Sequence, residues 1–126
     1  MDPELWSLVQ GAGVETLLRE AAAGQGVPVR TFPDVAGLLS REEPSGGIVL
    51  AIEGAGRYKS YLTILKRLQK NFFGFDVIVL GPAKSSETIM RERPLGVDRY
   101  LAIPVKEGEF STALAEMVAI RRIKSA

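Results

Sequence analysis

Short apolar runs alternate along the chain with segments whose apolar residues recur every three to four positions. Five runs are typical of β-strands, and they lie at 5–9, 27–32, 47–52, 77–80 and 99–103. The third and fourth runs are continuously apolar and rich in β-branched residues, as strands buried on both faces of a sheet are. The pattern therefore predicts a parallel sheet within an α/β fold.

A segment of helical periodicity follows each of the five runs. The clearest helix is predicted from about Tyr58 to Asn71, with one apolar side and one basic side. Ser85 or Ser86 is expected to cap a short fourth helix, which Pro94 prevents from extending far. A strand-helix unit repeated five times with right-handed crossovers predicts a doubly wound, flavodoxin-like sheet with strand order 2-1-3-4-5.

The composition excludes several classes of function. Cysteine and histidine are both absent, so disulfide frameworks, thiolate chemistry and Ser-His-Asp catalysis are excluded, and a zinc site is not expected. No apolar run approaches the roughly 18–20 residues that span a bilayer, and the first ten residues lack the pattern of a signal peptide. We therefore expect a single cytoplasmic domain over 1–126, compatible with being the N-terminal module of a longer protein.

The net charge of +1 conceals a strong asymmetry along the chain. Residues 1–53 carry eight acids and three bases, a balance of −5, whereas residues 54–126 carry seven acids and thirteen bases, a balance of +6. No acid occurs between Glu53 and Asp76. The basic side of the helix predicted in this stretch consists of Lys59, Lys66, Arg67 and Lys70.

This basic side of the helix, called the basic stripe below, has three interpretations. A solvated face is the ordinary one, and a docking face for an acidic protein partner is the functional alternative. Nucleic-acid binding is not expected, because the bases come without stacking aromatic residues on the same face.

In an open α/β sheet, ligands bind beyond the carboxyl ends of the strands, near the point where the strand order reverses. In this sequence that edge holds few polar side chains. The residues expected there are Gln10 and Gly11 after the first strand, Glu53 after the third, Gly81 after the fourth and Ile103 at the end of the fifth. The Gly-Ala-Gly segments at 11–13 and 54–56 complete no phosphate-binding motif and are better explained as tight turns.

The whole layout resembles the receiver domain of two-component response regulators. The resemblance is carried by GIVLAIEGAGRYKSYLTILKRL at 47–68, FDVIVLGPA at 75–83 and GVDRYLAIPVKEGEF at 96–110. It implies a signalling domain in which a pair of acids and an acceptor aspartate hold Mg²⁺, while a hydroxyl residue and a lysine complete the phosphorylation site.

Most of these chemical positions are changed in this sequence. The resemblance places the acid pair on Val9 and Gln10, or on Gln10 and Gly11 with a shift of one residue. It places the acceptor aspartate on Glu53, the hydroxyl residue on Gly81 and the lysine on Ile103. Tyr100, which matches the signalling aromatic residue of the fifth strand, is retained. A single carboxylate and an isoleucine do not supply the ligands and charges that phosphoryl transfer needs, so no metal, cofactor or enzymatic activity is expected.

Two functions remain open. The first is a non-phosphorylatable receiver-like domain that acts as a protein-interaction module in bacterial signalling, transcription control or motility. Its partner is then an acidic protein on the basic stripe, or a second copy through the fourth helix, fifth strand and fifth helix, where members of this family pair; a membrane partner is not expected. The alternative is a receiver that still switches, through Glu53 reaching toward the fourth strand as a mimic of phosphoaspartate, or through a small ligand in the vacated pocket.

Overall fold

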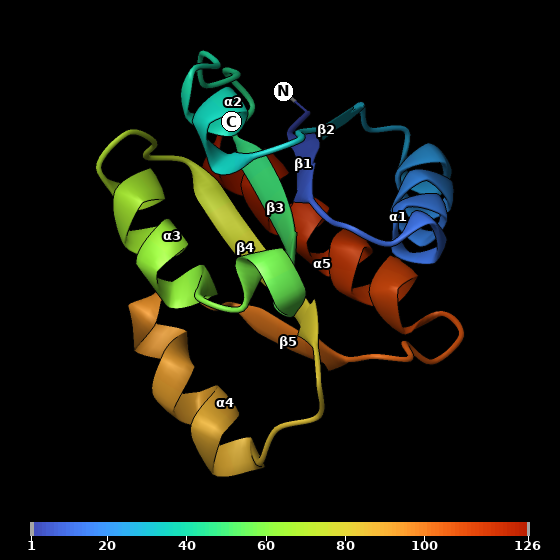
Figure 1. Ribbon diagram of the computed structural model, residues 1–126. Coiled ribbons are helices and arrows are strands. Elements are labelled where there is room, and N and C mark those ends of the chain that lie inside the picture. The colour runs from blue at the N-terminus through green and yellow to red at the C-terminus, as the bar shows by residue number, and fades with distance from the viewer. Residues whose placement is uncertain (1, 126) are drawn as a thin grey trace.

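The computed structural model describes residues 2–125, which fold around a five-stranded parallel sheet (Figure 1). The strands are β1 (Glu4–Leu8), β2 (Val29–Thr31), β3 (Ile48–Glu53), β4 (Phe75–Gly81) and β5 (Arg99–Ala102). Each adjacent pair is parallel, and the order is β2-β1-β3-β4-β5. The predicted flavodoxin-like fold and strand order are therefore confirmed.

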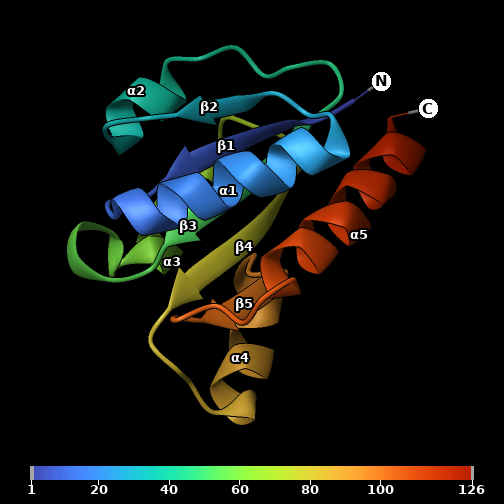
Figure 2. The ribbon, with the colours of Figure 1, turned by 90° about the vertical axis from the view of Figure 1, so that its right-hand side faces the viewer.

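Four helices connect the strands, and a fifth follows the last strand. They are α1 (Ala12–Gln25), α2 (Val35–Leu39), α3 (Tyr61–Gln69), α4 (Ser86–Glu92) and α5 (Glu109–Lys124), with short 3₁₀ turns at η1 (Gly56–Tyr58) and η2 (Arg93–Leu95). Helices α1 and α5 lie side by side on one face of the sheet, and α2 and α3 cover the other (Figures 1 and 2). Within residues 2–125, no helix is long and apolar enough to cross a membrane.

The sheet separates two hydrophobic clusters. Alternate residues of the central strands face opposite ways, so that Val49 and Ile78 pack with α1 and α5 while Leu50 and Val79 pack with α2 and α3. Trp6 belongs to the second cluster and is 1% exposed. Because both faces of β3 and β4 are buried, their sequences need no polar alternation, which explains the continuous apolar runs.

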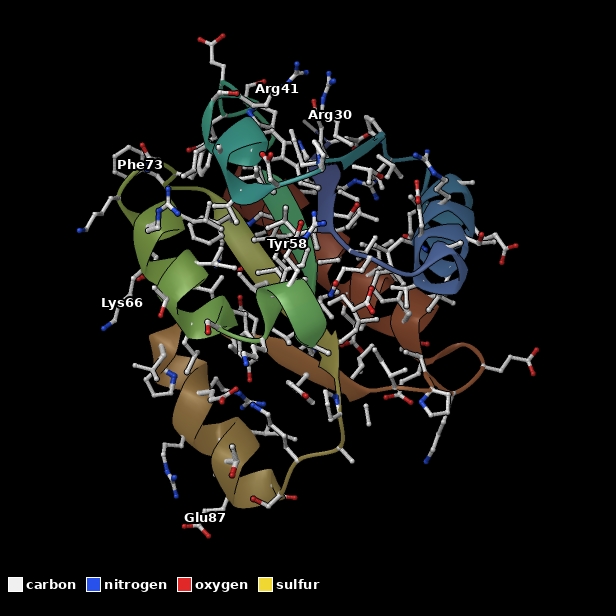
Figure 3. The ribbon with its side chains drawn as sticks, in the orientation of Figure 1. Arg30, Arg41, Tyr58, Lys66, Phe73 and Glu87 are labelled. Carbon is white, nitrogen blue, oxygen red and sulfur yellow. The ribbon has the colours of Figure 1, made fainter. Side chains whose placement is uncertain are left out.

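The basic helix begins later than its periodicity predicts. Gly56 takes a left-handed conformation with φ of 55°, and the chain forms η1 and a turn before α3 starts at Tyr61. Lys59 therefore lies in the turn and not on the helix, and Lys70 caps the helix C-terminus. The prediction of one helical stripe is wrong at Lys59, whereas Lys66 projects from the outer side of α3 (Figure 3).

A largely buried ion pair fastens α5 to the start of β4. The Nε atom of Arg121 lies 2.7 Å from Oδ2 of Asp76, and the two side chains are 10% and 14% exposed. The sequence analysis assigned the fifth helix to a possible pairing surface, but the Arg121 side chain turns inward and is not exposed on that surface. It passes Gly47 and Gly74, where an added Cβ would come within 3.2 Å of the arginine side chain.

Removing the arginine charge should destabilise the fold. Arg121→Met keeps an apolar stem but leaves the Asp76 carboxylate buried without its cation, so we expect a loss of about 2–4 kcal/mol in the free energy of unfolding, measured in urea. The neighbouring pair of Arg122 with Asp2 is 43% and 55% exposed and serves as the control, because Arg122→Met should cost less than about 1 kcal/mol. Adding Asp76→Leu to Arg121→Met should restore most of the loss; equal effects of the two methionine substitutions would contradict this account.

Candidate functional site

The carboxyl ends of the strands bring the predicted site residues to one edge of the sheet. β3 ends at Glu53 and β4 at Gly81, and these strands pair directly. Ile103 lies just beyond β5, where its N–H donates to the carbonyl of Gly81 over 2.8 Å, and its peptide bond to Pro104 is cis. The sequence therefore identified the residues that meet at this edge.

Glu53 binds the loop after β1. Its Oε1 atom accepts hydrogen bonds from the backbone N–H of Gln10 at 2.8 Å and of Gly11 at 3.0 Å. The Gln10 side chain completes the junction, donating to the carbonyl of Ala55 at 2.6 Å and accepting from the N–H of Arg57 at 3.2 Å. The carboxylate thus points toward β1, whereas a phosphoaspartate mimic was expected to reach toward the end of β4.

These residues do not fit a magnesium ion. Mg²⁺ is held by several hard oxygen ligands, usually carboxylates. Among the residues that the sequence analysis expected at this edge, Glu53 alone carries a carboxylate, and its Oε1 atom is already bonded to two backbone N–H groups. Within residues 2–125, no three acidic side chains are grouped so that they could hold a metal ion.

Tyr100 fills the space beside Gly81. The tyrosine is half-buried, and its hydroxyl donates to the carbonyl of Pro82 over 2.5 Å. A Cβ atom added to Gly81 would lie 2.7 Å from that hydroxyl and 3.1 Å from the carbonyl oxygen of Gly54. The glycine is therefore a steric requirement for this position of the ring.

A polar cluster that the sequence analysis missed adjoins Tyr100. The Nζ atom of Lys84 lies 3.1 Å from Oε2 of Glu92 and also donates to the hydroxyl of Tyr61. The Tyr61 hydroxyl in turn donates to Oε1 of Glu92 over 2.5 Å. The ammonium group is 4.8 Å from the centre of the Tyr61 ring and 5.3 Å from that of Tyr100, so it faces both rings.

The electrostatics of the cluster keep both tyrosines as hydrogen-bond donors. Burial raises the pKa of Tyr61, and the hydrogen bond to Glu92 and the charge of that carboxylate raise it further. Burial also raises the pKa of Tyr100, although the Lys84 cation opposes this effect. Both hydroxyls therefore stay protonated near neutral pH.

The polar cluster anchors α4. Glu92 is the buried residue of this helix, whereas Met90 is 68% exposed. Ser85 caps the helix as predicted, accepting from the N–H of Thr88 at 3.2 Å. The sequence signal for this cluster is Glu92, an acid three residues after the half-buried Ile89 and so on the same side of the helix. The spacing of residues does not reveal which groups pair with it.

Comparison with solved structures gives this arrangement a context. A response regulator receiver protein of Pseudoalteromonas atlantica matches with a TM-score of 0.76 and 16% identity, covering 93% of this chain and 98% of its own. The signal receiver domain of a candidate Luxo repressor protein of Vibrio parahaemolyticus matches at 0.81 and 12%, covering 98% and 95%. The chain has the receiver fold.

A third similar structure is described as a pilus assembly protein and not as a receiver. It is a candidate pilus assembly protein of Burkholderia thailandensis, with a TM-score of 0.71, 18% identity and coverage of 94% of this chain and 99% of its own. Neither a protein-family model nor a curated protein matches the sequence significantly. At these identities the likeness to receivers concerns the fold alone.

The close approach of Tyr100 to position 81 can be tested by substituting alanine for Gly81 and for a control glycine. Gly81→Ala should destabilise the domain by about 1–3 kcal/mol, because the new Cβ overlaps the tyrosine hydroxyl. Tyr100→Phe in the same chain removes that atom and should restore part of the loss. Gly13→Ala in α1 is the control, since nothing lies within 4 Å of its added Cβ. Urea unfolding of the parent chain, Gly81→Ala, Tyr100→Phe alone, the double variant and Gly13→Ala provides the measurement, and an absence of coupling between positions 81 and 100 would contradict this steric account.

Proposed function

We propose that this domain is a non-phosphorylatable receiver-like module that acts by binding other proteins, without a cofactor or enzymatic activity of its own. One observation carries the proposal: the side chains at the expected phosphorylation site are engaged by the chain itself. Glu53 is bonded to the β1 loop, and Tyr100 occupies the space beside Gly81. Phosphoryl transfer needs a metal ion and a cation beside the acceptor. The acid pair that would hold the metal ion is absent, and Ile103 stands at the position of the cationic lysine.

The setting that we propose is bacterial signalling, transcription control or motility, in the cytoplasm. The similar structures support this range, since they include response-regulator receivers and the candidate pilus assembly protein. A switching receiver exchanges between two conformations that a ligand stabilises unequally. Here Tyr100 is bonded to Pro82 and faces Lys84, which supports a domain that holds one conformation.

We further propose that the partner is acidic and docks on the basic face formed by Lys59, Lys66, Arg67 and Lys70. Of the salt bridges within residues 2–125, none uses any of these four side chains. Lys66 points away from the body of the protein (Figure 3). A second copy on the side of α4, β5 and α5 is the competing partner, because Met90 and Ile120 are exposed there by 68% and 41%.

The first test is chemical. Incubation with acetyl phosphate and Mg²⁺ is expected to produce no phosphorylated species by mass spectrometry, because the acid pair and the lysine are absent. Glu53→Asp, which restores the acceptor alone, should remain unmodified as well. In an NMR titration, Mg²⁺ with a phosphoryl-mimicking fluoride complex should leave the amides of Gln10 and Gly11 unshifted. An acyl phosphate on the unmodified sequence, or saturable shifts of these amides, would support the switching alternative instead.

The second test locates the partner. Lys66→Glu combined with Lys70→Glu should weaken retention of an interacting protein strongly at low salt and less at high salt, because exposed charges are screened. Retention on the immobilised domain from a lysate of the source organism, quantified by mass spectrometry, provides the measurement. Lys106→Glu, an exposed lysine outside the face, is the control. Loss of the interacting protein with Ile120→Asp but not with the double reversal would place docking on the α5 side.

A further inference from the structure

A groove lies between α2 and the segment that forms η1 and α3. It has a volume of about 480 Å³, which is within the range of ligand and peptide pockets. Its lining includes three aliphatic side chains, a tyrosine and two arginines. These residues are Val35, Ala36, Ile64, Tyr58, Arg57 and Arg67.

The floor of the groove is apolar and supported by the core. Val35 and Ile64 are half-buried and pack against the hydrophobic cluster beneath α2 and α3. Tyr58 is buried, and its hydroxyl donates to the carbonyl of Pro33 over 3.2 Å. The floor is therefore fixed by packing before anything binds, which lowers the entropic cost of binding.

The rim of the groove is positive. Arg57 and Arg67 are exposed, and neither forms a salt bridge within residues 2–125. Arg57 also donates from Nη1 to the carbonyl of Pro33 at 2.9 Å, which holds its stem across the start of α2. The lining contains one acid, Asp34, whose Oδ1 accepts from the N–H of Gly37 at 2.7 Å as the cap of α2.

Two other hollows lack this combination of an apolar floor and a positive rim. One is lined by Glu4 and Arg30, which already pair with each other at 2.9 Å. Another contains Asp76, which pairs with Arg121. In each of these hollows an acid is paired with an arginine, whereas the two arginines of the groove beside α2 form no salt bridge within residues 2–125.

We infer that this groove binds an acidic segment of a partner protein, with an apolar side chain against Val35 and Ile64 and carboxylates beside Arg57 and Arg67. The inference rests on the proposed docking function and specifies where and what the domain binds. Charge complementarity identifies the occupant: a stretch with no acid between positions 53 and 76 favours an acidic ligand, and the aliphatic floor requires a leucine-like side chain.

The test uses three synthetic hexapeptides, blocked at both ends, against the ¹⁵N-labelled domain. The probe has two leucines flanked on each side by two glutamates. One control replaces the leucines by alanines, and the other replaces the glutamates by lysines. The acidic leucine peptide should shift the amides of Val35, Ala36 and Ile64, and each control should bind at least about fivefold more weakly.

Variants separate the groove from the wider basic face. Ala36→Trp fills the groove without changing charge, and Arg57→Ala removes a rim cation that is not part of the basic face. Each should weaken binding of the acidic leucine peptide at least about fivefold. Arg41→Ala and Phe73→Ser, an exposed arginine and a 95% exposed phenylalanine outside the groove, are controls and should have no effect. Urea unfolding of each variant verifies that the fold is intact.

The outcomes distinguish this inference from the proposed function. Binding that survives Ala36→Trp but is lost with Lys66→Glu and Lys70→Glu would overturn the groove and keep docking on the basic face. Binding of the alanine peptide equal to that of the leucine peptide would also overturn it, since the apolar floor would then have no role. If single-stranded DNA or vesicles containing anionic lipid shifted the same amides equally, the groove would bind polyanions in general and not an acidic protein segment. Phosphorylation by acetyl phosphate, in contrast, would overturn the proposed function itself.

Discussion

The carboxylate of Glu92 lies in the interior, where an ionised group is costly unless it is paired and hydrogen-bonded. Tyr61 and Lys84 supply both requirements, and they come from α3 and from the loop between β4 and α4. α4 buries no other side chain, so its position depends on this polar contact more than on apolar packing. The same lysine faces the ring of Tyr100, which in turn requires a glycine at position 81. The position of α4 and of the loop before it therefore depends on one buried charge, which also places the Lys84 ammonium group beside the ring of Tyr100.

This arrangement bears directly on whether the domain switches. A ligand shifts a conformational equilibrium only by the difference in its affinity for the two states. In the present structure the groups that would sense a phosphoryl group are absent or already engaged, since Glu53 holds the β1 loop and Tyr100 holds Pro82. Under the proposed function, these hydrogen bonds stabilise one state and leave little for a ligand at this edge to act on. A constant surface is then the property on which partner binding can depend.

The fold was predictable from the sequence because two signals agreed. The continuous apolar runs of β3 and β4 indicate burial on both faces, and the alternation with helices leaves few parallel topologies. The start of α3 was not predictable, because Tyr58 in η1 and Tyr61 in α3 are both buried and so continue a helical period through the turn at Lys59. The direction of Glu53 depends on backbone N–H groups of another loop, which a residue pattern does not reveal. The contact of Lys84 with Glu92 depends likewise on tertiary placement.

The distribution of paired and unpaired charges separates what stabilises the fold from what is available for binding. Most arginines on the other elements pair with acids inside the domain, as Arg121 does with Asp76 and Arg99 with Glu116. The cations from Arg57 to Lys70 have no such carboxylate partner within the described residues, and exposed unpaired charges contribute little to folding. Mutual repulsion among them is a small cost that folding alone does not explain. An acidic partner on this side of the protein would remove that cost, and this is the physical reason to look for the partner beside α2 and α3 and not at the vacated edge of the sheet.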